Sequence, residues 1–326
     1  MYDIITIGSA TIDVFVDTEA GLFRPCKGCK GHVKVPFGSK ILIEKLNFFT
    51  GGGGTNTAVG FARLGLKTAW IGKLGDDQTG KTVLAELKKE RVNTRLATVS
   101  VGKTSGYSII LDAKGHDRTI LAHKGCNDEL LPSDVRLSKI KTRWVYCSSQ
   151  MGRSLSTLIR IVNHAKREGI SVAFNPSTYM IKNKRSTVRS LLRSTTALIF
   201  NKEEACLLVG EAPIRKTIER IHKMGPKYVV VTDGKNGAWG SYGRDVWFCK
   251  APNVKAVEAT GAGDSFATGF VAGIMKGMEV DEAMKIGMVE SASVIQHLGA
   301  KNILLTWKQA INKASGLPKI ICTRAK

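Results

Sequence analysis

Apolar runs of strand length alternate with longer stretches of helical period along most of the chain. Runs bounded by turn residues predict strands at 3–7, 68–71, 144–148, 171–174, 197–200 and 228–232. Apolar residues at helical spacing predict helices at 55–64, 79–90, 154–167, 202–209, 214–223, 263–275 and 281–298. Strands that alternate with helices form βαβ units, so the pattern predicts an α/β fold with a mostly parallel sheet.

Two stretches, residues 14–49 and 107–122, break this alternation and have no helix to cover them. The second contains the turn sequence Asp112-Ala113-Lys114-Gly115, and both have the pattern of β-hairpins. We expect them to pair as a small β-sheet lid over the carboxyl edge of the main sheet, where open α/β folds bind ligands. The sequence therefore predicts a single α/β domain over residues 1–326, with a lid subdomain inserted at about 14–49 and 107–122.

The composition is that of a soluble globular protein, with 43% hydrophobic and 23% charged residues in a chain of 326. No apolar run approaches the roughly 20 residues that are needed to cross a bilayer. Residues 2–8 have the pattern of a strand rather than of a signal peptide. The seven cysteines are odd in number and scattered, which favours reduced thiols. We therefore expect a cytoplasmic protein with no membrane contact.

Cys26, Cys29 and His32 have a spacing that could bind a metal ion. A tetrahedral zinc site normally needs four ligands, and the sequence offers no second pair. Turn chemistry in Cys26-Lys27-Gly28-Cys29 is the favoured interpretation. Metal binding by these three residues stays open.

The formal net charge of +22 raises the possibility of a nucleic-acid partner. The charges are dispersed, however, and the densest runs, 139–143 and 182–193, lack interleaved aromatic residues for base stacking. Nucleic acid is therefore not the expected partner. A non-catalytic nucleic-acid-binding protein is kept as an alternative function, and steep salt dependence of binding would identify it.

The most informative motif is Ala259-Thr260-Gly261-Ala262-Gly263-Asp264, where an extended segment meets a long apolar helix. Two glycines and an alanine leave backbone N–H groups bare at a helix N-terminus, which favours a bound anion. The Asp264 carboxylate would repel a phosphate there unless it has a chemical task. The task that fits is removing a proton from a hydroxyl that attacks phosphorus. The alternative is a glycine-rich helix start with an acidic cap.

A second glycine motif, Gly75-Asp76-Asp77-Gln78-Thr79-Gly80-Lys81-Thr82, fits the pattern of a phosphate-binding P-loop. The apolar run that ends in Asp233 could supply the Mg²⁺ carboxylate of such an enzyme. Asp76 and Asp77 argue against this interpretation, because like charges about 4 Å apart cost roughly 4 kcal/mol at an effective dielectric near 20. A P-loop NTPase that depends on Lys81 is kept as the other alternative.

Several motifs follow one another along the chain: Gly8-Ser9-Ala10-Thr11-Ile12-Asp13, Gly51-Gly52-Gly53-Gly54-Thr55-Asn56, Gly75-Asp76-Asp77, Asn201-Lys202-Glu203-Glu204, Thr232-Asp233-Gly234 and the 261–264 motif. Bare glycine backbone beside an amide and a carboxylate suits close approach of a polyol. This order resembles the ribokinase-like family of sugar and nucleoside kinases, also called the phosphofructokinase B family, over roughly residues 2–310. The resemblance implies a three-layer α/β/α domain with a mostly parallel central sheet and a small β-sheet lid.

The resemblance also implies catalytic roles. Asp264 matches the catalytic base, which takes the proton of the acceptor hydroxyl. The N–H groups of Gly261, Ala262 and Gly263 match the anion hole for the transferred phosphoryl group. In such a site, positioning and charge stabilisation supply most of the catalysis.

On the nucleotide side, Asn201 and Glu204 match a motif that organises Mg²⁺ and phosphates, with Glu204 acting on the metal through water. Thr232 and Gly234 match positions that contact the nucleotide, and Gly299 resembles a glycine near the adenosine. ATP is the expected donor, and ADP stays open. The structural alternative for Glu204 is an acid that stabilises the first turn of a helix.

On the acceptor side, Asp13, Gly52, Gly53 and Asn56 match positions that hold the hydroxyls of the acceptor. The structural alternatives are a helix cap for Asn56 and a turn former for Asp13. Gly53 stands where ribokinases often have a lysine, so the individual enzyme is not assigned. Asn175 stands where many members of the family have an aspartate.

The sequence thus predicts a Mg²⁺-dependent phosphotransferase that moves the terminal phosphoryl group of a nucleotide to a hydroxyl of a sugar, nucleoside or cyclic polyol. A nucleoside or a ribose-like sugar is the first expectation for the acceptor. Glu258-Ala259 replaces the Asp-Thr that is common in the family, which puts a monovalent-cation site in doubt. An exposed edge of the lid would allow two copies to pair as a homodimer.

Overall fold

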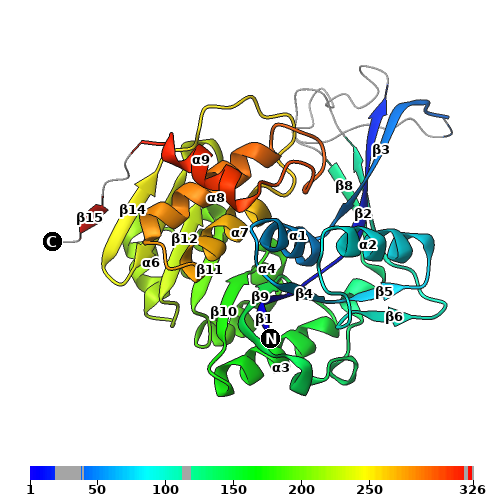
Figure 1. Ribbon diagram of the computed structural model, residues 1–326, viewed down its shortest axis with the longest axis horizontal. Coiled ribbons are helices and arrows are strands. Elements are labelled where there is room, and N and C mark those ends of the chain that lie inside the picture. The colour runs from blue at the N-terminus through cyan, green and yellow to red at the C-terminus, as the bar shows by residue number, and fades with distance from the viewer. Residues whose placement is uncertain (19–37, 39, 112–118, 319–321, 325–326) are drawn as a thin grey trace.

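The computed structural model of the protein describes all residues except 19–37, 39, 112–118, 319–321 and 325–326 (Figure 1). Cys26, Cys29 and His32 and the expected turn at 112–115 therefore lie outside the described residues. No helix within the described part of the chain is long and apolar enough to span a bilayer.

Among the described residues, a central sheet has the strand order β15-β14-β13-β12-β11-β10-β9-β1-β4. Its strands are β1 (Tyr2–Ile7), β4 (Thr68–Ile71), β9 (Thr142–Ser148), β10 (Ser171–Asn175), β11 (Ala197–Asn201), β12 (Tyr228–Thr232), β13 (Ala238–Tyr242), β14 (Asp245–Cys249) and β15 (Cys322–Arg324). The pairs from β4 to β12 are parallel, and the pairs from β12 to β15 are antiparallel. All the strands expected from the sequence lie in the parallel part, so the prediction of a mostly parallel sheet is confirmed.

Helices cover both faces of this sheet and complete three layers (Figure 1). One layer holds α3 (Ser154–Arg167), α4 (Thr178–Leu192), α5 (Lys202–Val209) and α6 (Ile214–His222). The other holds α1 (Gly53–Arg63), α7 (Ala262–Met275), α8 (Val280–Val294) and α9 (Trp307–Ser315). Leu158 and Val188 belong to one apolar core with Val145 of the sheet, whereas Phe61 and Phe270 belong to a second core with Ile4. The predicted three-layer α/β/α class is confirmed.

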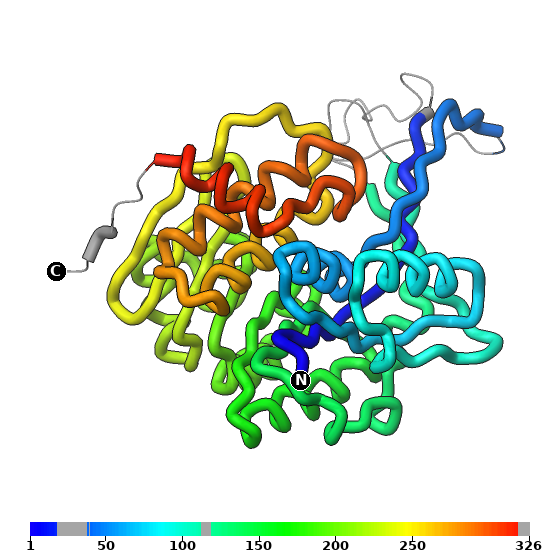
Figure 2. Tube along the Cα trace, viewed as in Figure 1, coloured from blue at the N-terminus to red at the C-terminus, as the bar shows by residue number. Residues whose placement is uncertain are grey.

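The two stretches that interrupted the alternation contribute to one small sheet, in the order β3-β2-β7-β8. Its strands are β2 (Thr11–Thr18), β3 (Ile43–Gly51), β7 (Gly106–Leu111) and β8 (Thr119–His123). Figure 2 shows these strands rising beside α1 and α2 (Gln78–Lys89) at one end of the central sheet. A two-stranded sheet of β5 (Lys73–Gly75) and β6 (Thr98–Ser100) lies below α2, and single 3₁₀ turns occupy Gly125–Asp128, Pro132–Asp134, Leu137–Lys139 and Gly234–Asn236. The predicted small second sheet is confirmed.

Some elements differ from those expected. Residues 182–193 have the pattern of a run of charge, but they belong largely to α4. This helix forms because Ser177 caps it and Met180, Val188 and Leu191 are buried. The helix expected at 281–298 ends at Val294, and the chain turns there to reach the glycine at 299. The antiparallel strands β13 and β14 were not expected, because the alternation of strands with helices stops after β12.

Helices α1 and α7 cross at a point where both have small residues. A Cβ atom added to Gly60 would lie 2.7 Å from the Thr268 Cγ2 atom, so only glycine fits the crossing. Asn56 and Asp264 each lie one helical turn before these two residues. The close crossing therefore brings the first turns of α1 and α7 together.

We expect Gly60→Ala to lower the free energy of unfolding by about 1–3 kcal/mol, because the added methyl group overpacks the crossing. Adding Thr268→Ser removes the clashing Cγ2 atom and should recover much of the loss. Chemical denaturation of the two single variants and the double variant measures this coupling. Gly316→Ala is the control, because its added Cβ atom would have only one ordinary contact, at 3.5 Å. Strictly additive effects of Gly60→Ala and Thr268→Ser would contradict the steric account.

Candidate active site

Three neighbouring parallel strands end in polar residues at one cleft of about 200 Å³. Asn175 ends β10, Asn201 ends β11 and Thr232 ends β12. The lining of the cleft comprises Asn175, Ile199, Phe200, Asn201, Glu204, Thr232, Gly261, Gly263 and Asp264. The cleft thus lies at the carboxyl edge of the sheet, where ligands bind in open α/β folds.

The start of α7 forms one wall of this cleft. Gly261 has φ +82°, and an added Cβ atom would lie 2.5 Å from the Ala300 Cβ atom, so glycine is required there. The Ala262 N–H group donates to the Ala259 carbonyl at 3.2 Å. The first N–H groups of a helix, together with its dipole, favour an anion at this end.

Asp264 follows in the first turn of α7 and is linked to α1. Its Oδ2 atom accepts a hydrogen bond from the Asn56 Nδ2 atom at 2.8 Å. Burial raises the pKa of Asp264, while the Asn56 amide and the Lys301 ammonium act in the opposite direction and the Asp13 carboxylate raises it further. The result is a carboxylate that is more basic than an exposed aspartate.

The glycine loop at 51–54 brings the N-terminal motif to the same place. Added Cβ atoms would lie 1.8 Å from the Asp13 Oδ2 atom at Gly51 and 3.5 Å from the Asp264 Oδ1 atom at Gly53. Gly52 has φ +95° and precedes α1 as its N-cap residue. Three distant parts of the sequence are therefore neighbours: Asp13, the segment with Gly52, Gly53 and Asn56, and Asp264.

Asp13 lies in the small sheet and is only 8% exposed. The Thr11 hydroxyl donates to its Oδ1 atom at 2.9 Å. Burial raises the pKa of Asp13, and hydrogen bonds from the Thr11 and Ser108 side chains lower it. On the same face, Phe15 and Phe49 pack edge to face with ring centroids 5.6 Å apart. This face offers a carboxylate beside aromatic surface.

Asn201 and Glu204 form a capping box at the start of α5. The Asn201 Oδ1 atom accepts from the Glu204 N–H at 2.8 Å, and the Glu204 Oε2 atom accepts from the Asn201 N–H at 2.9 Å. The Thr178 hydroxyl donates to Glu204 Oε1 at 3.2 Å. Burial raises the pKa of Glu204, which is 8% exposed. Glu204 thus stabilises the first turn of α5, as its structural alternative predicts, and the same residue lines the cleft.

Thr232 lines the cleft, whereas Gly234 lies in the following turn with φ +51°. Gly299 lies against the small sheet, because an added Cβ atom would be 2.8 Å from the Phe49 ring. It does not line the cleft at the strand ends. The nucleotide contacts assigned to Gly234 and Gly299 stay predictions.

The second glycine motif has a geometry that does not favour a P-loop. Asp77 caps α2, and its Oδ1 atom accepts from the Gly80 N–H at 2.8 Å and from the Ser105 hydroxyl at 2.7 Å. An added Cβ atom on Gly80 would lie 2.2 Å from the Gly75 carbonyl oxygen. The Asp77 carboxylate thus accepts a hydrogen bond within the loop itself, while Lys81 is exposed.

Sequence reasoning missed two residues at the site. Ser108 of β7 bonds Asp13 across the sheet, and a strand residue of this kind has no motif that identifies it. Lys301 is buried and acts on both Asp13 and Asp264. The signal for Lys301 was a lysine two residues after Gly299 and shortly before the apolar run 303–305. Asn175, which stands where many members of the family have an aspartate, lines the cleft.

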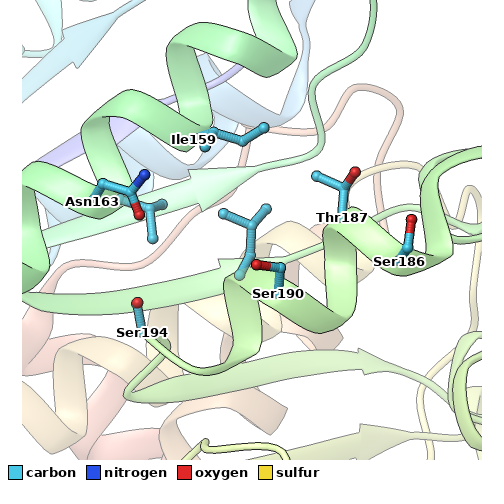
Figure 3. Close-up of a pocket in the computed structure, with 8 residues that line it drawn as sticks. Ile159, Asn163, Ser186, Thr187, Ser190 and Ser194 are labelled. Carbon is cyan, nitrogen blue, oxygen red and sulfur yellow. The ribbon is translucent and has the colours of Figure 1, made fainter.

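Figure 3 shows another cleft, of about 340 Å³, between α3 and α4. Asn163, Ser186, Ser190 and Ser194 contribute polar groups to it, and none of its lining residues is charged. It lies in a helical layer rather than at the ends of strands. The strand-end cleft, which contains the Asp264 and Glu204 carboxylates, is therefore the candidate active site.

Comparison with known proteins identifies the family. The model of the pfkB family of carbohydrate kinases matches residues 1–307. The chain belongs to the pfkB family of carbohydrate kinases. The resemblance noted in the sequence and the predicted enzyme class, a kinase, are thereby confirmed.

Relatives within this family cover most of the chain. A protein of Archaeoglobus fulgidus described as an uncharacterized sugar kinase is 32% identical over 248 residues, which is 74% of this chain and 97% of that protein. A ribokinase of Haemophilus influenzae is 28% identical over 289 residues, or 86% and 93% of the two chains. The structure of Arabidopsis thaliana ribokinase complexed with ribose and ATP superimposes with a TM-score of 0.80 at 21% identity, covering 96% of this chain and 98% of that one.

We expect Asp264→Asn to raise the melting temperature at neutral pH, on the order of 1 °C for a chain of this size. The folded state raises the pKa of Asp264 and so disfavours its ionised form, and asparagine has no charge to bury. The gain should disappear as pH falls below about 4, where the carboxylate is protonated in both states. Thermal unfolding from neutral pH to about pH 3 measures the effect.

Asp76→Asn is the matched control, because Asp76 is exposed and its Oδ1 atom accepts one backbone hydrogen bond, from Gly102. This substitution should leave the melting temperature nearly unchanged over the same pH range. A gain at Asp264 that does not depend on pH would contradict the assigned burial of charge.

Proposed function

We propose that the protein is a Mg²⁺-dependent kinase that transfers the terminal phosphoryl group of ATP to a hydroxyl of a sugar, nucleoside or cyclic polyol. Asp264 is the catalytic base in this proposal. A ribose-like sugar or a nucleoside is the first candidate for the acceptor, and ADP remains a second candidate for the donor.

One observation carries the proposal: the 2.8 Å hydrogen bond between Asn56 and Asp264. It fixes the Asp264 carboxylate between two groups of residues. On one side are the strand-end cleft and the start of α7, which suit phosphate. On the other side are the glycine loop and the Asp13 carboxylate, which suit hydroxyl groups. A base between a phosphate site and a hydroxyl site is what phosphoryl transfer to an alcohol requires.

The residues on the donor side fit a magnesium ion held through phosphate and water. No group of three or more His, Cys, Asp or Glu side chains that could hold a metal occurs among the described residues. Mg²⁺ keeps several waters and is usually bound by one or two carboxylates together with substrate phosphates. The buried Glu204 carboxylate at the cleft suits that mode, because a nearby cation would favour its ionised form. The ion would neutralise charge on the phosphate oxygens.

Residues of the chain accept the proton of the acceptor hydroxyl and stabilise the charge on the transferred phosphoryl group. As the acceptor oxygen bonds to the terminal phosphorus, the bond from that phosphorus to the bridging oxygen of the nucleotide breaks and ADP leaves. The acceptor proton passes to the Asp264 carboxylate, whose raised pKa makes it a stronger base. The N–H groups of Gly261 and Gly263, which line the cleft at the start of α7, stabilise the charge on the transferred group. The Ala262 N–H group, which the sequence also assigned to the anion hole, instead donates to the Ala259 carbonyl.

The small sheet completes the acceptor side. Asp13 accepts hydrogen bonds from acceptor hydroxyls, and Phe15 and Phe49 supply apolar surface on the same face. Closure of this sheet over the acceptor would exclude water and suppress hydrolysis of the nucleotide.

The decisive experiment measures turnover with ATP, and separately ADP, against nucleosides, pentoses, hexoses and inositols. We expect one acceptor class to be phosphorylated, and Asp264→Asn to lower kcat by about 10²- to 10⁴-fold. Lys81→Ala is the matched control and should retain activity, because Lys81 is exposed on α2. Hydrolysis without an acceptor that is lost in Lys81→Ala would favour a P-loop enzyme instead.

We also propose that two copies pair through the small sheet. Leu46 and Phe48 on β3 and Leu121 on β8 are 46%, 58% and 54% exposed. Strand pairing puts all three on the same face of this sheet, because Leu46 and Phe48 pair with Val16 and Val14, which continue to Leu121 through Ile109 of β7. An apolar face on edge strands is a typical site of self-association.

We expect the wild-type protein to elute as a dimer in size-exclusion chromatography with light scattering. Phe48→Glu with Leu121→Glu should convert it to a monomer, because buried unpaired charge opposes association. Tyr179→Glu is the control, since Tyr179 is an aromatic residue that is 62% exposed on α4. A wild-type monomer, or dissociation by the control substitution, would contradict pairing through the small sheet.

A further inference from the structure

Lys301 is a buried cation behind the glycine loop. It is 4% exposed, and its Nζ atom lies 2.6 Å from the Glu86 Oε2 atom of α2. It also donates to the Thr55 Oγ1 atom of α1 at 3.4 Å. The Thr55 hydroxyl in turn donates to the Gly51 carbonyl at 2.6 Å. Lys301 is thus connected to the glycine loop, which lies against Asp13 and leads into the turn of α1 that carries Asn56. It does not line the strand-end cleft.

A second cation fixes the backbone that carries Lys301. The Arg63 guanidinium of α1 donates to the carbonyl oxygens of Lys301 and Leu304 at 3.1 and 3.2 Å. Arg63 is also paired with Glu90, the C-cap residue of α2, at 2.7 Å. Two ion pairs, Lys301–Glu86 and Arg63–Glu90, therefore link the segment that carries Lys301 to α2 and link α1 to the end of α2. These links fix the position of the ammonium group.

The charges around Lys301 are mainly negative. Glu86 of α2 and Glu90 at the C-cap of α2 act on it from one side, and Asp13 acts on it from β2. Asp13 and Asp264 repel each other, and Lys301 attracts both. Burial lowers the pKa of Lys301, whereas Glu86 and Asp13 raise it. The hydrogen bonds place the ammonium beside both carboxylates. Thr55, which accepts from Lys301, donates to the carbonyl of Gly51 next to Asp13. The residue after Thr55 is Asn56, whose amide donates to Asp264.

We propose that Lys301 is a positioning residue that holds the glycine loop and supplies the positive charge that offsets Asp13 and Asp264. This inference rests on the proposed function of Asp264 as a base. Two carboxylates near one acceptor hydroxyl would otherwise favour a shared proton, which removes the base. The Lys301 charge keeps Asp264 ionised while its hydrogen bond to Thr55 keeps the loop in register.

The test compares two substitutions that break the same ion pair with opposite effects on charge. Lys301→Met removes the ammonium, and Glu86→Gln leaves it in place. The pH dependence of kcat/KM is measured for both, with Lys301→Arg as the conservative variant and thermal unfolding as the check on folding. We expect Lys301→Met to move the acidic limb to higher pH by about one unit, equivalent to about a tenfold loss below the limb. Glu86→Gln and Lys301→Arg should not move it upward.

Carboxyl NMR titration of ¹³C-labelled aspartate gives the same comparison without turnover, with the Asp264 signal assigned from Asp264→Asn. We expect the pKa of Asp264 to rise in Lys301→Met and not in Glu86→Gln. An unchanged pKa in Lys301→Met, or an equal rise in both variants, would overturn the role of the Lys301 charge. If the wild-type protein phosphorylates no acceptor, the proposed function fails, and the titration still decides whether Lys301 controls Asp264.

Discussion

The close crossing of α1 and α7 is the constraint on which the site depends. Gly60 has no side chain where the Thr268 methyl group approaches, so the two helices can touch. One turn earlier, the same geometry brings the Asn56 amide to the Asp264 carboxylate. The glycine loop leads into α1, which places Asp13 and its aromatic neighbours on the other side of the Asp264 carboxylate. A local packing requirement thus joins the two halves of the site.

The site concentrates negative charge in a protein whose formal net charge is +22. Asp13, Asp264 and Glu204 are all held where burial raises their pKa. Such groups lower stability and are typical of functional positions. Lys301 offsets two of them from behind the loop, and the positive end of α7 faces the cleft. The excess of exposed lysine and arginine would also attract anionic nucleotides.

The sequence predicted the structure best where a motif is compatible with only one local backbone structure. Glycines before Asn56 and Asp264 predicted helix starts with bare backbone, and both helices begin there. Residue patterns also predicted the parallel strands and the small second sheet. Helix α4 was missed because its buried residues are few and lie within a run of positive charge. Lys301 was missed because its role depends on Glu86 and Thr55, which only the fold brings near. The competing P-loop motif matched in residue identity but not in structure, because Asp77 accepts a hydrogen bond from the backbone of the same loop.

The most direct test of the central claim separates binding from chemistry at Asp264. Calorimetric titration of ATP with Mg²⁺ is combined with single-turnover transfer to the acceptor, for the wild-type protein and Asp264→Asn. If Asp264 is the base, both proteins bind the nucleotide with similar affinity, and transfer in the variant falls by about 10²-fold or more. Transfer by Asp264→Asn at the wild-type rate would contradict the account, because the carboxylate would then have no part in the reaction.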